Sequence, residues 1–135
     1  NNVWWWRPLW GYVSEIACKE ILTEKQKSSG HFNDGCLISE VQALAIAKRL
    51  RHLLECGAVR RQELDYRKSV NEMPDVECSI CKGQGERNDA FVKGICNACK
   101  GKGTVRPFET SYPFEESNVR EFAEFCQTSG GFEIW

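Results

Sequence analysis

Four of the eight cysteines fall into two copies of one pattern, C-x-x-C-x-G-x-G, which begin at Cys78 and Cys96. Two thiolates three positions apart can hold one side of a tetrahedral Zn²⁺ ion, and a second pair completes its shell at about 2.3 Å per bond. The glycines permit positive φ, so the chain can turn tightly after each pair and present N–H groups to the sulfurs. The sequence therefore predicts one structural zinc ion per chain, with four ligands: Cys78, Cys81, Cys96 and Cys99.

A closed shell of four thiolates leaves no coordination position for water, so this zinc is expected to support the fold and not to activate water. Its binding, of the order of 10–16 kcal/mol in zinc-finger peptides, can fold a segment too short and too polar to build its own core. The alternative is thiol–disulfide exchange, which C-x-x-C pairs also perform. That role favours a strand–helix context, whereas glycine turns follow these pairs.

The other four cysteines are expected to be free, buried core thiols: Cys18, Cys36, Cys56 and Cys126. A zinc site built from thiolates needs reduced cysteines, which predicts a reducing compartment and hence a cytoplasmic protein. Cys36 is kept as a candidate ligand of a second site or a candidate nucleophile, because it follows a polar turn.

Apolar residues at helical spacing predict helices on both sides of the cysteine-rich segment. The first follows Pro8 and is expected to end before Gly30, and the second opens on a capping box formed by Ser39 and Gln42. The expected helical ranges are 9–27, 39–57, a short basic 59–70 and 117–130, and residues 132–135 read as a short strand or docked tail.

The predicted fold class is mainly α: a small helical bundle with an inserted zinc-binding β-hairpin. A chain of 135 residues can bury one sufficient core without disulfides. The expected regions are a helical part over 1–76, the zinc hairpin over 77–107, and a C-terminal helix and tail over 108–135 that pack back on the helical part.

Four of the five tryptophans lie within the first ten residues: Trp4, Trp5, Trp6 and Trp10. Three adjacent indoles are costly to leave in water, because each buries roughly 150–250 Å² when packed. One interpretation is a hydrophobic lid over the helical core. The other is an aromatic patch for a partner or a stacked base, and the sequence leaves the choice open.

The segment around His31 and Asp34 combines a titratable pair with turn chemistry at Asn33-Asp34-Gly35. A histidine near a carboxylate can act as a catalytic or metal-binding pair, and Cys36 follows closely. The simpler interpretation is that His31 lies at a helix end or meets solvent. Their role stays open at this point.

Charge is unevenly distributed along a chain whose formal net charge is −1. Residues 48–68 and 82–106 are rich in Lys and Arg, whereas residues 107–135 are acidic. Such basic stretches are typical of solvated helix faces, and also of surfaces that bind nucleic acid or an acidic protein. No apolar run approaches the ~20 residues of a membrane span, so no membrane partner is expected.

Residues 78–106 resemble half of the cysteine-rich region of DnaJ-type chaperones, which is built from C-x-x-C-x-G-x-G repeats. The resemblance implies a zinc-binding hairpin that helps to bind other protein chains, with Gly83, Gly85, Gly101 and Gly103 as turn residues. This chain has two repeats rather than four, which implies one zinc ion. It also lacks the His-Pro-Asp tripeptide of the J-domain. The flanking segments resemble small bacterial proteins.

The sequence favours a protein-interaction, adaptor or regulatory module and not an enzyme, because it contains no G-x-S-x-G, H-E-x-x-H, complete P-loop or G-x-G-x-x-G. A contact surface is expected at the hairpin, from Phe91, Val92 and Ile95 with Lys100 and Lys102. Nucleic-acid binding through residues 48–68 and 82–106 is the alternative. An enzyme that uses His31, Asp34 and Cys36 is a third hypothesis. The oligomeric state is not predicted.

Overall fold

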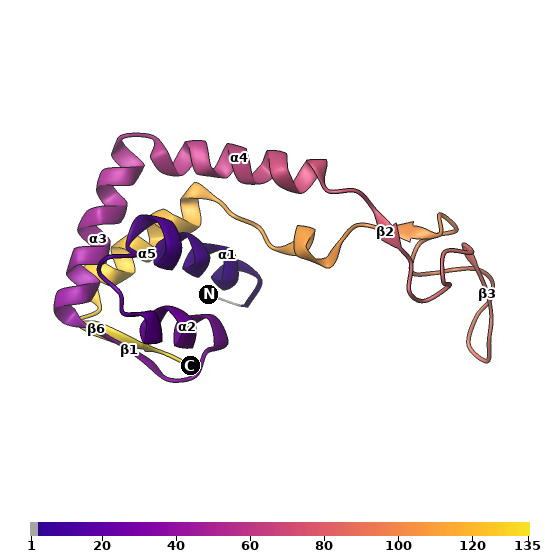
Figure 1. Ribbon diagram of the computed structural model, residues 1–135, viewed down its shortest axis with the longest axis horizontal. Coiled ribbons are helices and arrows are strands. Elements are labelled where there is room, and N and C mark those ends of the chain that lie inside the picture. The colour runs from indigo at the N-terminus through magenta and orange to yellow at the C-terminus, as the bar shows by residue number, and fades with distance from the viewer. Residues whose placement is uncertain (1–2) are drawn as a thin grey trace. The chain divides into compact units, whose positions relative to one another are not determined.

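The computed structural model describes residues 3–135, which divide into two compact units (Figure 1). The helical unit contains the chain up to Lys68 together with Tyr112–Trp135, and the cysteine unit is Ser69–Ser111. The prediction of a mainly helical fold with small hairpins is confirmed. The helical elements are α1 (Val3–Gly11), the π-helix η1 (Tyr12–Ala17), α2 (Glu24–Phe32), α3 (Glu40–Glu55), α4 (Ala58–Glu72), the 3₁₀ turn η2 (Phe108–Ser111) and α5 (Glu116–Thr128). The strands are β1 (Cys36–Ser39), β2 (Val76–Glu77), β3 (Glu86–Asn88), β4 (Lys93–Ile95), β5 (Thr104–Val105) and β6 (Gly131–Ile134).

The N-terminal segment is not the single helix predicted over 9–27. The π-helix ends at Ala17 and α2 begins only at Glu24, where Thr23 and Gln26 form a capping box. Gly30 does not end a helix: it lies inside α2, which ends at Asn33 in the left-handed conformation (φ 55°). Pro8 also lies inside α1 and not at its first position.

The core of the helical unit forms where α3 packs beside α5 (Figure 1). The capping box of Ser39 and Gln42 opens α3, as predicted. Each helix turns an apolar stripe inward, because buried residues recur at helical spacing. The buried residues are Ala43, Ile46, Ala47 and Leu50 on α3, and Asn118, Val119, Phe122, Ala123 and Cys126 on α5.

The N-terminal tryptophans differ in their burial. Trp10 is fully buried and stacks on Trp6 with ring centroids 5.2 Å apart. Both indoles donate to backbone carbonyls of α2: Trp6 Nε1 to Gly30 (2.9 Å) and Trp10 Nε1 to Lys27 (3.0 Å). Trp4 is 40% exposed and its ring lies 5.2 Å from that of Tyr112. The lid interpretation therefore describes Trp6, which packs against the core, whereas Trp10 is part of the core itself.

The C-terminal tail is a strand. β6 pairs antiparallel with β1, with Cys36 opposite Ile134 and Ser39 opposite Gly131. Gly131 has φ 98°, and a Cβ there would lie 2.9 Å from the Ile38 carbonyl oxygen. This pairing joins the two sequence segments of the helical unit, because β1 precedes the cysteine unit and β6 follows it.

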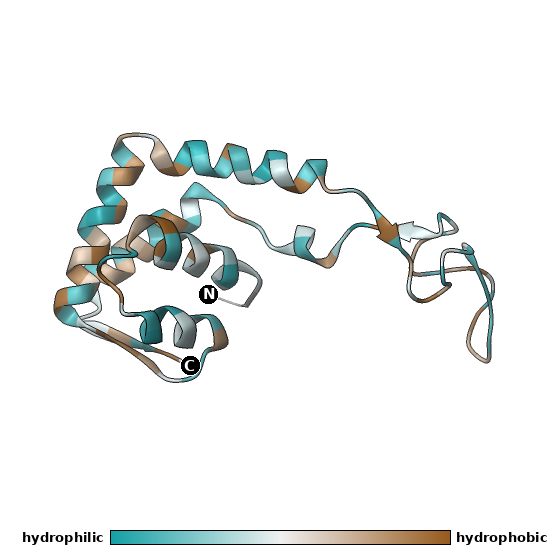
Figure 2. Ribbon diagram, in the orientation of Figure 1, coloured by the Kyte–Doolittle hydropathy of each residue, from teal (hydrophilic) through white to brown (hydrophobic). Residues whose placement is uncertain are grey.

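α4 is the most polar of the long helices, and hydrophilic residues dominate its visible face in Figure 2. Its buried Glu63 accepts ion pairs from Arg60 (2.9 Å) and Arg67 (2.5 Å). An unpaired buried carboxylate is costly, and the two arginines offset that cost by pairing with Glu63. In the part of the chain that the structure describes, no helix is long and apolar enough to cross a lipid bilayer.

Candidate metal centre

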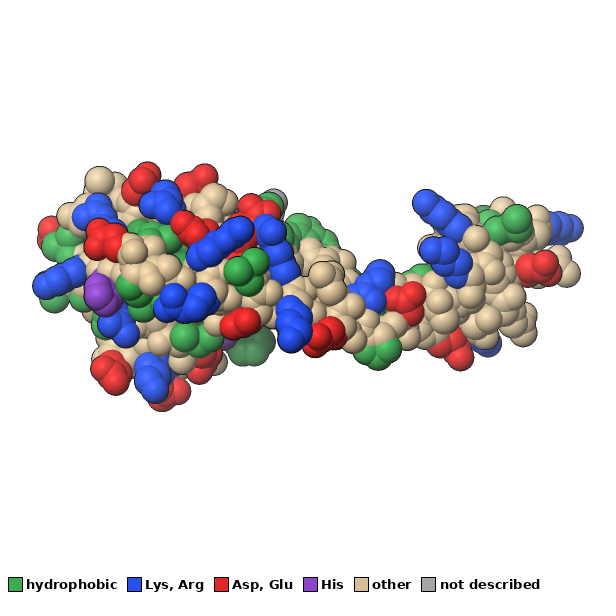
Figure 3. Space-filling view, turned by 90° about the horizontal axis from the view of Figure 1, so that it is seen from above, with side chains coloured by type: hydrophobic (Ala, Val, Ile, Leu, Met, Phe, Trp, Pro, Cys, Tyr) green, Lys and Arg blue, Asp and Glu red, His purple; other side chains and the backbone are tan. Residues whose placement is uncertain are grey.

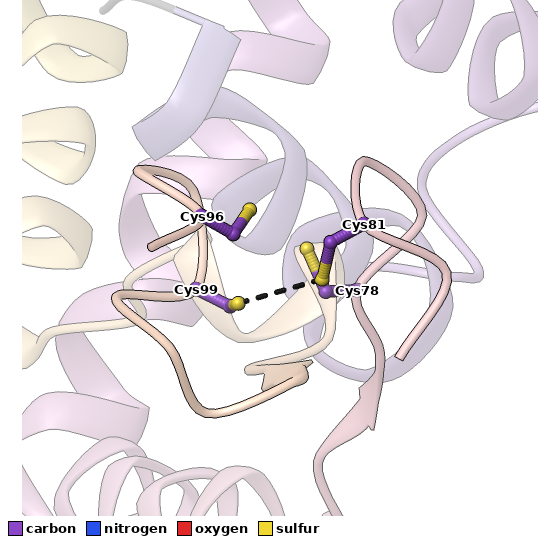
Figure 4. A group of neighbouring side chains, drawn as sticks. All are labelled: Cys78, Cys81, Cys96 and Cys99. Atoms are coloured by element: carbon purple, nitrogen blue, oxygen red, sulfur yellow. Dashed lines mark hydrogen bonds between the residues drawn. The ribbon is translucent and has the colours of Figure 1, made fainter. Parts of the chain in front are cut away.

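The four cysteines of the repeats meet in the cysteine unit. Cys78 and Cys81 lie in the turn after β2, and Cys96 and Cys99 lie in the turn after β4. All four side chains are buried, at 5% exposure or less. Their sulfur atoms lie within 4.8 Å of one another and point toward a common centre (Figure 4). The four cysteines that the repeat spacing predicts as ligands therefore lie together in the structure.

The two repeats fold in the same way and pair with each other. In each repeat the residue after the second cysteine, Lys82 or Lys100, adopts a left-handed conformation (φ 51° and 54°). The Cys78 N–H donates to Gly103 O (2.9 Å), and the Cys96 N–H donates to Gly85 O (2.8 Å). Each repeat thus caps the other with an equivalent hydrogen bond, as in a local twofold arrangement.

The last glycine of each repeat is required by close backbone approach. A Cβ on Gly85 would lie 2.5 Å from Gly101 O, and a Cβ on Gly103 would lie 2.3 Å from Gly83 O. The same glycines donate their N–H groups to sulfur: Gly85 to Cys81 and Gly103 to Cys99, each at 3.2 Å. Such N–H donors stabilise thiolates and orient metal ligands.

Gly103→Ala should therefore weaken metal binding by the cysteine unit. The expected loss of affinity is roughly 10- to 100-fold, as when other groups that orient metal ligands are altered. The added methyl must displace the Gly83 carbonyl, so the sulfurs move apart. Gly94→Ala is the matched control: Gly94 also has positive φ (112°), but nothing lies within 4 Å of its Cβ position. Competition titration with a chromogenic zinc chelator measures both affinities. Equal affinities would contradict the close-approach argument.

The geometry fits a tetrahedral ion. For metal–sulfur bonds of about 2.3 Å, the sulfurs of a tetrahedral site stand roughly 3.8 Å apart. The Sγ atoms of Cys81 and Cys99 are 3.6 Å apart, far beyond the roughly 2.05 Å of a disulfide. All eight cysteines, all of which lie among the described residues, are free. The cluster is one site that could hold a metal ion.

The surroundings shift the pKa values of two of the thiols in opposite directions. Desolvation by burial raises the pKa of Cys81 to about 11. At Cys99 burial also acts upward, but hydrogen bonds from Gly103 N–H, Cys81 and Cys96 outweigh it and bring the pKa below its ordinary value. A divalent cation at the centre would favour the thiolate form of every ligand, because metal ligation needs deprotonated sulfur.

The other predicted site residues, His31, Asp34 and Cys36, differ in their exposure to solvent. His31 lies half-buried in α2, while Asp34 is exposed in the turn that follows. Cys36 is buried on β1 and its thiol donates to Gln26 O at 3.3 Å. Burial raises the pKa of Cys36, which disfavours the thiolate that a nucleophile needs.

Two of the remaining cysteines behave as predicted and one does not. Cys18 and Cys126 are buried, and desolvation raises the pKa of each to about 12. Cys56 is exposed, so the expectation of a core thiol is wrong there. It follows the last turn of α3 as the C-cap residue, where the chain turns toward Gly57 and leaves the apolar stripe.

The basic stretches contain arginines that already serve the fold. In the helical unit, Arg49 donates to Ala17 O, and Arg60 and Arg67 pair with Glu63. In the cysteine unit, Arg106 donates to Met73 O and Val70 O, each at 2.6 Å, and pairs with Asp75. The lysines of the cysteine unit are exposed: Lys82, Lys93, Lys100 and Lys102.

No family model, no curated protein and no solved structure matches this chain. The likeness to the DnaJ cysteine-rich region therefore rests on the repeats alone. The fold defines a class of module. Two glycine-bounded cysteine turns, flanked by two short antiparallel strand pairs, surround a buried cluster that could hold a metal ion.

Proposed function

We propose that the protein is a zinc-binding interaction module, in which a structural zinc ion rigidifies a protein-contact surface on the cysteine unit. The observation that carries the proposal is Phe91, whose side chain is 92% exposed at the end of the β3–β4 hairpin. Large aromatic side chains are enriched among the residues that dominate protein contacts, and this one lies on a loop held by hydrogen bonds.

Zinc is the metal that suits this donor set. Four thiolates at tetrahedral spacing are the ligands of structural zinc sites, and they fill every coordination position. In the described chain, the buried cluster of the cysteine unit consists of the four cysteines, with Val105 packed against it. A unit whose described buried cluster is formed by the metal-binding residues themselves supports a structural role for the ion, and a filled coordination shell supports a role without catalysis at the metal. The need for reduced cysteines supports a cytoplasmic location.

The loop that carries Phe91 is braced by Asp89. Its carboxylate accepts from the N–H groups of Phe91 (2.8 Å) and Val92 (2.9 Å) and from Arg87 Nε (2.7 Å). Arg87 also donates to Asn97 Oδ1 at 2.8 Å, next to Cys96. The backbone at Phe91 is thus connected to Asn97 in the metal-binding turn through the side chains of Asp89 and Arg87.

The hydrogen bonds to the Asp89 carboxylate are expected to persist at neutral pH. The N–H groups of Phe91 and Val92 and the Arg87 side chain hold the pKa of Asp89 below its ordinary value. A group whose pKa is lowered by folding contributes stability above its unfolded pKa, and that contribution is lost as the pH falls through the lowered value. The loop is therefore expected to stay ordered at physiological pH.

The surface around Phe91 combines apolar and cationic groups. Ile95 is 69% exposed on β4, and Lys93 is exposed on the same strand. Figure 3 shows hydrophobic and basic side chains near one another on the visible face of this unit. Such a surface suits a protein partner that offers an apolar pocket with acidic residues at its rim.

The test is capture of partners by the zinc-loaded full chain from an extract of the source cells, with and without nuclease. We expect a protein that is retained after nuclease treatment and that the Phe91→Ser variant binds at least about tenfold more weakly. Val41→Ser is the matched control, because Val41 is also exposed (77%) but lies on α3 in the other unit.

Two outcomes would contradict this assignment. Equal capture by Phe91→Ser and by the unaltered chain would remove the surface from the proposal. Capture that disappears after nuclease treatment would favour the nucleic-acid alternative, for which the exposed lysines of the cysteine unit are the supporting observation. Salt dependence then separates them further, because binding through phosphates weakens steeply as salt rises.

A further inference from the structure

The helical unit has an open hollow of about 430 Å³ beside α5 and β6. Aromatic rings from three elements line it: Trp6, Phe122, Phe125 and Phe132. The rings support one another, because the Phe122 centroid lies 5.8 Å from both Trp6 and Phe132, each in an edge-to-face arrangement. Phe125 and Phe132 are 5.2 Å apart. The aromatic rings that line the hollow therefore pack against one another.

Two acidic residues are among those that line this hollow. Glu121 lies one position before Phe122 on α5, and Glu133 follows Phe132 on β6. Among the described residues that line the hollow, no lysine or arginine balances them. Trp135 also lines the hollow, and its ring lies 3.4 Å from the Cβ position of Gly35.

We propose that this hollow binds an organic cation of the quaternary ammonium type. The faces of Trp and Phe rings attract cations within about 6 Å, and trimethylammonium groups suit such sites because they are both charged and apolar. The carboxylates add charge attraction that a neutral ligand would not receive. A hollow of this volume falls in the range of small-molecule sites, and a compact, strongly hydrated ion would gain little from aromatic walls. This inference is independent of the cysteine unit.

The test compares choline with 3,3-dimethylbutan-1-ol, which has the same shape without the charge. Titration of the full chain, followed by the NMR signal of the Trp6 indole N–H, reports binding at the hollow. We expect saturable choline binding in the millimolar range or tighter, with the neutral isostere at least about tenfold weaker. An amide of N-trimethyllysine, titrated in parallel, tells whether the cation is better supplied by a free small molecule or by a protein side chain.

Variants separate the roles of charge and of the rings. Glu121→Gln and Phe125→Leu should each weaken choline binding severalfold, because the first removes a carboxylate one helical turn before Phe125 and the second removes an aromatic face. Glu124→Gln is the control: it lies on the same helix and is exposed, but it does not line the hollow. Circular dichroism confirms that each variant is folded.

Two results would overturn the inference. Equal affinity for choline and its neutral isostere would make the hollow merely apolar. Absence of any saturable shift of the Trp6 signal, in a chain that remains folded, would remove the site altogether. Loss of zinc from the cysteine unit changes neither expectation, so this test and the partner-capture test fail independently.

Discussion

Cys96→Ser should unfold the cysteine unit and leave the helical unit folded. The unit's buried cluster in the described chain is made by the four cysteines themselves, whereas a separate cluster of apolar residues holds the helices. Loss of one thiolate removes much of a binding free energy that is about 10–16 kcal/mol in zinc-finger peptides. Two-dimensional NMR should show collapsed amide dispersion for residues 76–105, while the helical circular dichroism signal is largely kept.

Metal analysis of the same samples tests the zinc assignment directly. The unaltered chain should contain one zinc ion, and Cys96→Ser should contain little. Cys56→Ser is the matched control, because Cys56 is a free, exposed cysteine outside the cluster, and its variant should keep the metal. Zinc near zero in the unaltered chain, with a disulfide between Cys78 and Cys81, would disprove the metal site. Complete loss of helicity in Cys96→Ser would show that the ion supports the entire fold.

Gly30→Ala should destabilise the helical unit by roughly 1–3 kcal/mol or more, as overpacked cores do. Gly30 lies inside α2, where alanine is ordinarily preferred by about 1 kcal/mol. However, its Cβ would lie 2.3 Å from the indole ring of Trp10. Because Trp10 is fully buried and hydrogen-bonded to Lys27 O, the ring cannot move away cheaply. Urea denaturation followed by circular dichroism at 222 nm measures the loss.

The control for this prediction is Gly11→Ala. Gly11 also lies at helical dihedral angles (φ −56°), but a Cβ there meets only His31, at an ordinary distance of 3.9 Å. That substitution should be neutral or stabilise by up to about 1 kcal/mol. If both variants lost similar stability, flexibility of the backbone and not contact with Trp10 would explain the glycine at position 30.

The metal-site cysteines and the central helices could be predicted from the sequence because their signals are local. Repeats with fixed spacing place two sulfurs on one turn, and the capping box of Ser39 and Gln42 marks the start of α3. Thr23 and Gln26 form the same capping pattern, but they lie inside the range 9–27, which apolar periodicity predicts as one continuous helix. In the structure the capping box begins a separate helix at Glu24.

Features that depend on distant contacts could not be predicted. Nothing in the sequence near Gly30 indicates that an indole from α1 occupies its side-chain position. The hydrogen bonds that Asp89 accepts were partly predictable, because aspartate often accepts from an N–H group two residues further along the chain. The contact with Asn97 was not, because it depends on the pairing of β3 with β4. The aromatic hollow likewise requires β6 to lie beside α5, which the alternation of residues 132–135 does not specify.

The hydrogen bond from Tyr66 Oη to Tyr112 O, at 2.6 Å, ties together the two points at which the chain leaves and re-enters the helical unit. The segment between Tyr66 and Tyr112, which includes the cysteine unit, can therefore be treated as one long loop of the helical unit. The entropy of closing a loop grows only with the logarithm of its length, by about 0.6 kcal/mol per doubling. In evolution the cysteine unit could therefore be gained, lost or exchanged for another insert at small energetic cost to the helical unit.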